Sequence, residues 1–184
     1  EFPKSLDINK QTLYFLKKYE NFLVNLQKEN VKIDFIRHFQ TKYDKNVFIG
    51  QKIDPNIKKS KKVNRKYHLV FSSNSKRSFQ TAKLYSNKIE RLKLLNEIDY
   101  GLVEGLDINS LKIKYPNIQK LWFKNKDPKF PKGENTKNVK TRLKKFLNFV
   151  KDLKLDCTKK YLVVTHNVVI RCLLGSLLKI PMHN

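Results

Sequence analysis

The chain has 184 residues, which suits one α/β domain with a sizeable core and is short for two, because a domain usually takes about 100 to 200 residues. Its hydrophobic content of 40%, with 11% aromatic residues, excludes the disordered class, whose chains bury too little apolar area to offset the entropy of ordering. The formal net charge of +24 favours anionic partners.

The leading segment, residues 1–30, predicts an amphipathic helix. Between about residues 7 and 27 its apolar side chains recur at three- and four-residue spacing, as on one face of a helix. They are Leu13, Leu16, Tyr19, Phe22, Leu23 and Leu26. We expect this helix to precede a single domain over residues 31–184. A linker from a preceding module is the second interpretation of the segment.

The first part of the domain predicts strands and helices in alternation. Residues 31–37 form a short β-rich run, and residues 49–62 form a loop marked by glycine, proline and a cluster of lysines. Residues 67–73 predict a second strand. A helix over residues 75–88 follows, with serine and asparagine as capping residues at its start. Residues 91–97 predict a third strand.

The remaining elements continue the alternation. Residues 107–123 predict a helix that is interrupted at Pro116, because proline lacks the backbone N–H that a helix needs. Residues 136–153 predict a long amphipathic helix, residues 161–166 a fourth strand and residues 168–178 a last helix. Strands separated by helices indicate a three-layer α/β/α fold with a mostly parallel central sheet.

Five polar residues fall at the carboxyl ends of the predicted strands, where α/β proteins place their functional crevice. Arg37 and His38 close the first strand, and Arg77 follows the second within one turn. Glu97 closes the third strand and His166 the fourth. We therefore expect two histidines, two arginines and one carboxylate to converge on one edge of the sheet.

These residue types suit phosphoryl transfer. Arginine and imidazole donors stabilise the charge on the phosphoryl oxygens in the transition state. A neutral imidazole can attack phosphorus, and neighbouring cations lower its pKa, so His38 is the predicted nucleophile. Glu97 would protonate the leaving oxygen and later activate water. This chemistry needs no metal and no cofactor.

Two cysteines, Cys157 and Cys172, fall in different predicted elements and form no metal-ligand spacing with histidine. A reducing, cytoplasmic location is the resulting prediction. Residues 161–180 are the longest apolar stretch, but a histidine, an asparagine and an arginine interrupt it, which would be costly in a bilayer. We expect no membrane association.

Five segments resemble, in order, the motifs of the histidine phosphatase (phosphoglycerate mutase-like) superfamily. The resemblance implies the phosphoglycerate mutase-like fold and covers about residues 31 to 178. The segments are FIRHFQT at 35–41, FSSNSKRSFQTA at 71–82, LNEIDYGLVEG at 95–105, PKGEN at 131–135 and VVTHNVVIR at 163–171.

The resemblance also implies a role for individual residues. It makes His38 the phosphorylated nucleophile and Glu97 the proton donor, with Glu104 as the alternative acid. It implies that Glu134 orients a loop near the mouth of the substrate site. The remaining residues are implied to bind phosphate or line the pocket: Arg37, Thr41, Arg77, His166 and Asn167.

Three positions depart from the family pattern. Phe39 and Asn167 each replace a glycine that follows a catalytic histidine in the family. A left-handed backbone suits glycine, is tolerated by asparagine and disfavours phenylalanine, so we expect Phe39 to reshape its position, narrowing the pocket or lowering activity. Asp44 stands where many members have asparagine, and its carboxylate would repel an anionic substrate.

The leading hypothesis is a metal-independent phosphatase that acts on a small phosphorylated metabolite through a phosphohistidine at His38. One alternative is mutase-type phosphoryl transfer. Another is a catalytically weakened member that binds nucleic acid or a partner through its basic surface. Nucleic acid is the less favoured partner, because only 6 of the 40 basic residues are arginines and the lysines are spread along the chain, as is typical of solvated faces.

Overall fold

The computed structural model describes residues 31–43, 46–61, 63, 67–124 and 126–179. The predicted leading helix and Asp44 lie outside the described residues.

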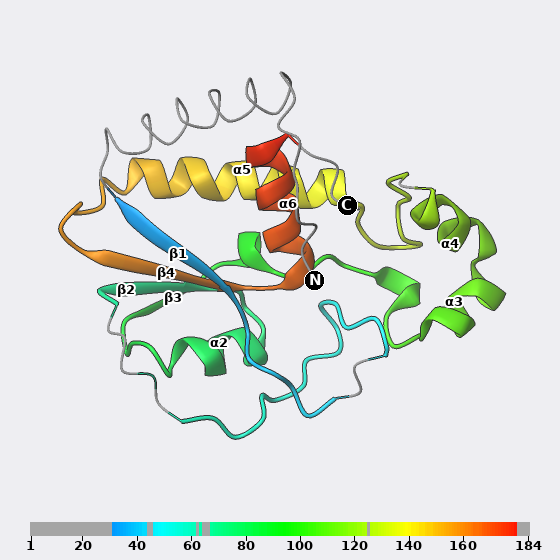
Figure 1. Ribbon diagram of the computed structural model, residues 1–184, viewed down its shortest axis with the longest axis horizontal. Coiled ribbons are helices and arrows are strands. Elements are labelled where there is room, and N and C mark those ends of the chain that lie inside the picture. Colours follow the sequence, from blue (N-terminus) through cyan, green and yellow to red (C-terminus); the bar gives the residue numbers. More distant parts are fainter. Residues whose placement is uncertain (1–30, 44–45, 62, 64–66, 125, 180–184) are drawn as a thin grey trace, which may run out of the picture.

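Four strands form one sheet in the order β1-β4-β2-β3, with every neighbouring pair parallel (Figure 1). They are β1 (Lys32–Arg37), β2 (Leu69–Ser72), β3 (Ile89–Arg91) and β4 (Lys160–Thr165). Strand β4 lies between β1 and β2 and is buried from Tyr161 onward, which accounts for its continuous apolar run. The predicted parallel sheet is confirmed.

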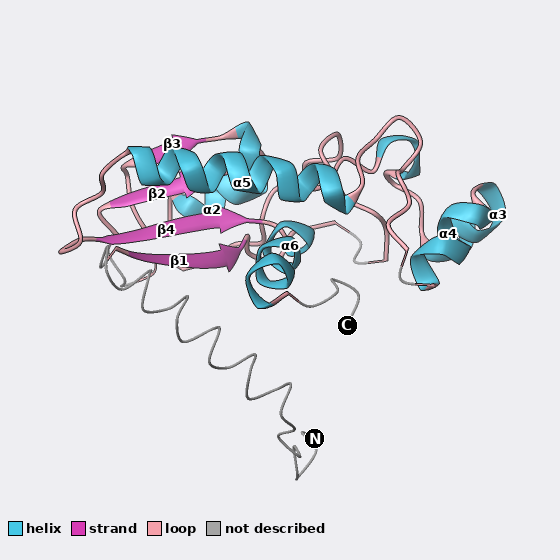
Figure 2. Ribbon diagram, turned by 90° about the horizontal axis from the view of Figure 1, so that it is seen from above, coloured by secondary structure: helices cyan, strands magenta, loops and turns pink. Residues whose placement is uncertain are grey.

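Helices cover both faces of the sheet, which confirms the three-layer prediction. Figures 1 and 2 show α5 (Thr136–Asp152) and α6 (Asn167–Leu178) on one side and α2 (Lys76–Ala82) on the other. Helix α2 is shorter than the prediction of residues 75–88. It ends at Ala82, and the N–H groups of Leu84 and Tyr85 donate to carbonyls three residues earlier, as in turns.

Side chains of successive strand residues enter opposite layers. Phe71 and Val163 pack with Phe146 of α5 in one cluster of buried residues. Val70 and Leu162 belong to a second cluster on the α2 side. The period of two along each strand therefore divides the apolar residues between the two helical layers.

The prediction of a third strand at residues 91–97 is wrong. The strand is Ile89–Arg91, and Lys93–Leu95 form a 3₁₀ helix, η1. Strand β2 ends at Ser72, which pairs with Arg91, so no neighbour remains for a longer strand. The leucines that suggested a strand instead pack in the cluster under α5.

A second group of short helices lies beyond the carboxyl ends of the strands (Figure 1). It comprises η2 (Gly101–Val103), α3 (Ile108–Lys114) and α4 (Pro116–Phe123). Pro116 is the first residue of α4, and Tyr115 before it has a non-helical backbone, which confirms the predicted interruption.

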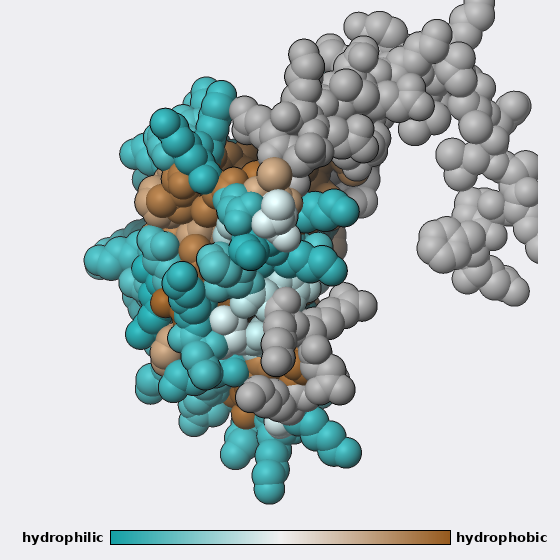
Figure 3. Space-filling model, turned by 90° about the vertical axis from the view of Figure 1, so that its left-hand side faces the viewer, coloured by the Kyte–Doolittle hydropathy of each residue, from teal (hydrophilic) through white to brown (hydrophobic). Residues whose placement is uncertain are grey.

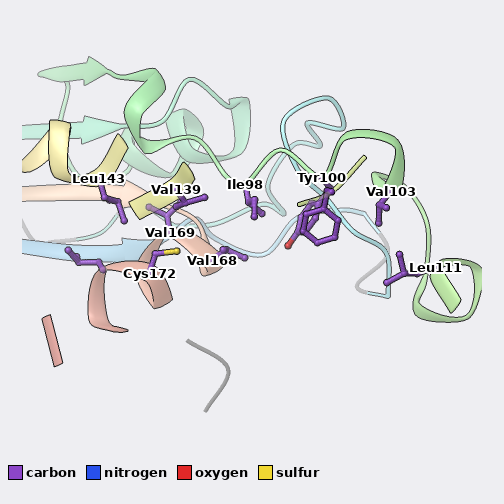
Figure 4. Close-up of a cluster of buried hydrophobic side chains, with 11 residues drawn as sticks. Ile98, Tyr100, Val103, Leu111, Val139, Leu143, Val168, Val169 and Cys172 are labelled. Carbon is purple, nitrogen blue, oxygen red and sulfur yellow. The ribbon is translucent and has the colours of Figure 1, made fainter. Parts of the chain in front are cut away.

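One hydrophobic cluster connects the two regions (Figure 4). It runs from the α5–α6 contact to the segment around η2, so the loop that follows η1 is packed against the main core. The labelled members are Ile98, Tyr100, Val103, Leu111, Val139, Leu143, Val168, Val169 and Cys172.

The opposite end of the molecule, where β1 and β4 begin, is largely hydrophilic (Figure 3). Within the described part of the chain, no helix is long and apolar enough to cross a membrane. The most apolar helix, α6, has 12 residues, whereas a span takes about 20.

Candidate active site

A cavity of about 590 Å³ lies at the carboxyl end of the sheet and brings together five of the predicted site residues. Arg37 is the last residue of β1 and His38 follows it, while Asn167 is the first residue of α6. Thr41 and Glu97 also line the cavity. Of the five residues expected to converge from the strand ends, Arg37, His38 and Glu97 line this cavity, whereas Arg77 and His166 do not.

The imidazole of His38 is held in one tautomer. Its Nδ1 lies 2.8 Å from the carbonyl oxygen of Phe39, and because a carbonyl can only accept, Nδ1 carries the hydrogen. Nε2 therefore keeps its lone pair and accepts a hydrogen bond from Nε of Arg77 at 3.3 Å. Burial, with help from Arg77 and Arg37, lowers the pKa of His38 to about 4. Nε2 is thus an unprotonated nitrogen at neutral pH.

The guanidinium of Arg77 is buried and every nitrogen of it has a partner. Besides the bond to His38, Nη2 donates to the carbonyl of Gly50 at 2.7 Å, and Nη1 donates to the carbonyl of Ile53 and pairs with Asp54, both at 3.1 Å. The loop of residues 50–54 therefore fixes the guanidinium, which holds a positive charge beside Nε2.

Asp54 lies in the predicted loop of residues 49–62 and is a functional residue that the sequence pattern does not reveal. Besides pairing with Arg77, its carboxylate accepts from the backbone N–H of Lys76 at 2.6 Å, the first residue of α2. The only signal is indirect: Arg77 is predicted to lie at the edge of the sheet, and an arginine that is buried there needs a counter-charge.

Glu104 does not line the cavity. Its carboxylate accepts backbone N–H groups from four consecutive residues, Gly50 to Ile53. A side chain at Gly50 would meet Oε2 of Glu104 and the carbonyl of Ile98 at 2.9 Å, so glycine is needed for this close approach. Glu104 thus anchors the loop that holds Arg77, and the structure gives this carboxylate no place as an acid in the cavity.

Glu134 also lies outside the cavity lining and acts on a loop. It forms an ion pair with Arg142 at 3.0 Å and accepts the backbone N–H of Asp99. Arg142 in turn donates to the carbonyls of Leu94 and Glu97. The pair therefore holds the segment that carries Glu97.

Glu97 reaches the cavity from a loop after η1, and not from the end of a strand as predicted. It is only 7% exposed, and burial raises the pKa of its carboxyl, opposed by backbone hydrogen bonds from Ile98 and Val168 and by the charge of Arg77. The raised pKa favours a protonated carboxyl that can act as an acid.

His166 is fully buried beside His38, with ring centroids 5.1 Å apart. Its Nε2 lies 2.8 Å from Oγ of Ser73, and its Nδ1 has no partner among the described residues. Burial lowers the pKa of His166 well below the ordinary value, helped by Arg77. The two motif imidazoles thus share one site, although His166 contributes nothing to the described cavity wall.

The replacement of glycine by Phe39 does not force a left-handed backbone. Among the described residues other than glycine, only Lys132, Lys154 and Lys179 have positive φ. The N–H of Phe39 donates to Oγ1 of Thr81 at 2.9 Å, and its ring packs edge-on against Tyr85. The expected backbone distortion is absent, and the Phe39 side chain lines the cavity.

Within the described part of the chain, no group of three or more histidine, cysteine or acidic residues is arranged to hold a metal ion.

Comparison with known proteins identifies a family. A family model described as "Histidine phosphatase superfamily (branch 1)" matches residues 33–184. Among curated proteins, 6-phosphofructo-2-kinase/fructose-2,6-bisphosphatase 4 of Rattus norvegicus is 33% identical over 114 residues, which are 59% of this chain and 22% of that protein. The chain thus spans about a fifth of the length of such relatives.

Solved structures share the fold. The alpha-ribazole phosphatase of Shigella flexneri matches with a TM-score of 0.66 and 19% identity, over 82% of this chain and 81% of that one. A mycobacterial glucosyl-3-phosphoglycerate phosphatase matches with a TM-score of 0.65 and 20% identity, over 82% and 80% of the two chains.

Replacing Glu104 tests its hold on the loop. Glu104→Ala leaves four backbone N–H groups without their acceptor, so we expect the free energy of unfolding to fall by about 1 to 3 kcal/mol. Amide hydrogen exchange at residues 50–53 should accelerate, and Glu104→Gln should lie between this variant and wild type. Asp152→Ala, at the exposed end of α5, is the control. Unchanged exchange in Glu104→Ala would contradict the assignment.

The lowered pKa of His38 predicts a loss of stability in acid. An unfolded histidine binds a proton near pH 6.5 and folded His38 only near pH 4, so the unfolded state binds more protons in this window. The free energy of unfolding, from urea titrations, should therefore fall between pH 7 and 4. His38→Gln should flatten this slope only in part, since the pKa of His166 is also lowered.

Proposed function

The chain belongs to the histidine phosphatase superfamily, and from this membership we propose that it is a phosphatase that hydrolyses a small phosphomonoester through a phosphohistidine at His38. One observation carries the proposal. Nδ1 of His38 is hydrogen-bonded to a carbonyl oxygen, so Nε2 is unprotonated, and His38 lines the cavity beside the buried Arg77. The proposed chemistry uses side chains alone.

In the first step, Nε2 of His38 attacks phosphorus. A P–N bond forms as the P–O bond to the alcohol breaks, and Glu97 donates a proton to the departing oxygen. Arg37 in the cavity wall and Arg77 beside Nε2 supply positive charge to the phosphoryl oxygens. Nε of Arg77, which donated its hydrogen bond to Nε2 of His38, then donates it to a phosphoryl oxygen.

In the second step, water attacks the phosphohistidine. Glu97, now a carboxylate, takes a proton from that water, the P–N bond breaks and Nε2 of His38 regains its lone pair. Inorganic phosphate leaves, and the enzyme returns to its starting protonation state.

His166 is proposed to bind the phosphoryl group. Its Nδ1 is buried without a partner among the described residues, which is costly unless a ligand supplies one. If Nε2 accepts the hydroxyl hydrogen of Ser73, then Nδ1 carries a hydrogen that a phosphoryl oxygen can accept.

Trapping the intermediate tests the proposal. Wild-type protein incubated with 4-nitrophenyl phosphate and quenched in alkali should contain an alkali-stable, acid-labile phosphoryl group. His38→Ala should contain none and should lose turnover by a factor of about 10³ or more, while His68→Ala behaves as wild type. Release of phosphate equimolar with the phenol indicates hydrolysis, and phosphate transfer to an added alcohol indicates mutase-type chemistry. Equal turnover by wild type and His38→Ala would refute the nucleophile.

Leaving-group dependence tests Glu97. Glu97→Gln should lower the single-turnover rate of phosphohistidine formation from alkyl phosphates by a factor of about 10² to 10⁴, and much less from 4-nitrophenyl phosphate, whose leaving group needs no proton. In wild type, the rate should fall as pH drops through about 4, where His38 gains a proton. It should also fall as pH rises through the raised pKa of Glu97, because the acid form is lost. An equal loss for both ester types would argue against an acid role.

A further inference from the structure

Two side chains hold the main chain at Glu97. The carbonyl oxygen of Glu97 accepts a hydrogen bond from the side-chain amide of Gln51 at 2.8 Å and another from Nη2 of Arg142 at 3.0 Å. Arg142 belongs to α5 and Gln51 to the loop of residues 50–54, so the two donors come from separate parts of the fold. Both lone pairs of the carbonyl oxygen are engaged, and its direction is fixed.

This carbonyl is connected to the carboxyl of the same residue. The C=O of Glu97 and the N–H of Ile98 belong to one planar peptide group. That N–H donates to Oε1 of Glu97 at 2.9 Å, and the N–H of Val168 at the start of α6 donates to the same carboxyl. If the peptide group turned, its N–H would leave Oε1, so a side chain that holds the carbonyl also holds the acid.

Gln51 links two parts of the site. Its Oε1 accepts a longer hydrogen bond, at 3.4 Å, from the amide of Asn96, the residue before Glu97. Its own loop, residues 50–54, fixes the guanidinium of Arg77 through two backbone carbonyls. One side chain therefore joins the loop that holds the arginine beside the nucleophile to the segment that carries the acid.

We propose that Gln51 is a positioning residue for the acid step: its amide orients the peptide group between Glu97 and Ile98, and through this group the carboxyl of Glu97. The inference rests on the phosphatase function proposed above. Gln51 does not line the cavity, so it acts on the leaving group only through Glu97.

Of the two donors to this carbonyl, Gln51 is the one whose role can be isolated. Arg142 is largely buried and pairs with Glu134, so its removal would leave a carboxylate without its partner and destabilise the fold. Gln51 is exposed, and substitutions at exposed positions usually change stability little. A variant of Gln51 should therefore fold normally, and a defect in it reports on orientation.

Two esters that differ in one nitro group test the proposal. Gln51→Leu keeps the approximate size of the side chain and removes its amide. We expect the single-turnover rate of phosphohistidine formation from phenyl phosphate to fall by about tenfold or more, because a displaced acid cannot protonate the leaving oxygen. The rate from 4-nitrophenyl phosphate, whose leaving group needs no proton, should fall by less than about twofold. An equal fall for both esters, or no fall for either, would overturn the inference.

Lys52→Met is the matched control. Lys52 lies in the same loop, and its side chain also donates to a backbone carbonyl, that of Gly101 at 3.2 Å, which is not part of the Glu97 segment. The ratio of the two rates should stay at the wild-type value in this variant. The same change of ratio in Lys52→Met and Gln51→Leu would show a general effect of the loop and would count against a specific role of Gln51.

A double variant shows whether Gln51 acts through Glu97. In a Glu97→Gln background the acid is already absent, so adding Gln51→Leu should change the ratio of the two rates by less than about twofold. A further loss as large as that in the wild-type background would place the effect elsewhere and overturn the inference. Absence of phosphohistidine from both esters in wild-type protein would instead overturn the proposed function.

Discussion

The hydrogen bond between Nδ1 of His38 and the carbonyl of Phe39 is the constraint on which the site depends. It decides which ring nitrogen carries the hydrogen, and therefore which one keeps a lone pair for the proposed attack. Burial then keeps the other nitrogen unprotonated, because an imidazolium would lose its hydration there. The geometry follows from strand β1, whose last residue leads directly into His38 at the edge of the sheet. A histidine that exchanged freely between its two tautomers would carry the hydrogen on Nε2 part of the time and would then have no lone pair there.

Carboxylates in this strongly basic chain are used mainly to hold backbone in place. Glu104 binds four successive N–H groups, Asp54 binds the start of α2 as well as Arg77, and Glu134 acts through Arg142 on the segment of Glu97. His38 and Glu97 lie in loops that follow β1 and η1, and loops need such fixed acceptors to keep a defined shape. The rigidity of the site is therefore supplied by acidic residues that do not touch the cavity.

Local patterns in the sequence are sufficient to predict the parallel sheet, the helical layers and the residues at the ends of β1 and β4. They failed where long-range packing decides the conformation. Glu97 was placed at a strand end, yet it reaches the cavity from a loop because β2 is too short to pair beyond Ser72. The partnership of Asp54 with Arg77 spans 23 positions and leaves no periodic trace. Phe39 is accommodated through contacts with Thr81 and Tyr85, which lie far from it in the sequence, so local patterns could not predict them.

The position of β4 in the sheet has a consequence for folding. Its first residue pairs with Lys32, so that contact closes a stretch of chain from position 32 to position 160. Strands β1 and β2 touch β4 and not each other, and they therefore have no common partner until β4 has been synthesised. During translation the apolar side chains of β1 and β2 stay exposed until β4 has left the ribosome. This long-range pairing slows folding, and the exposed side chains favour binding of chaperones to the nascent chain.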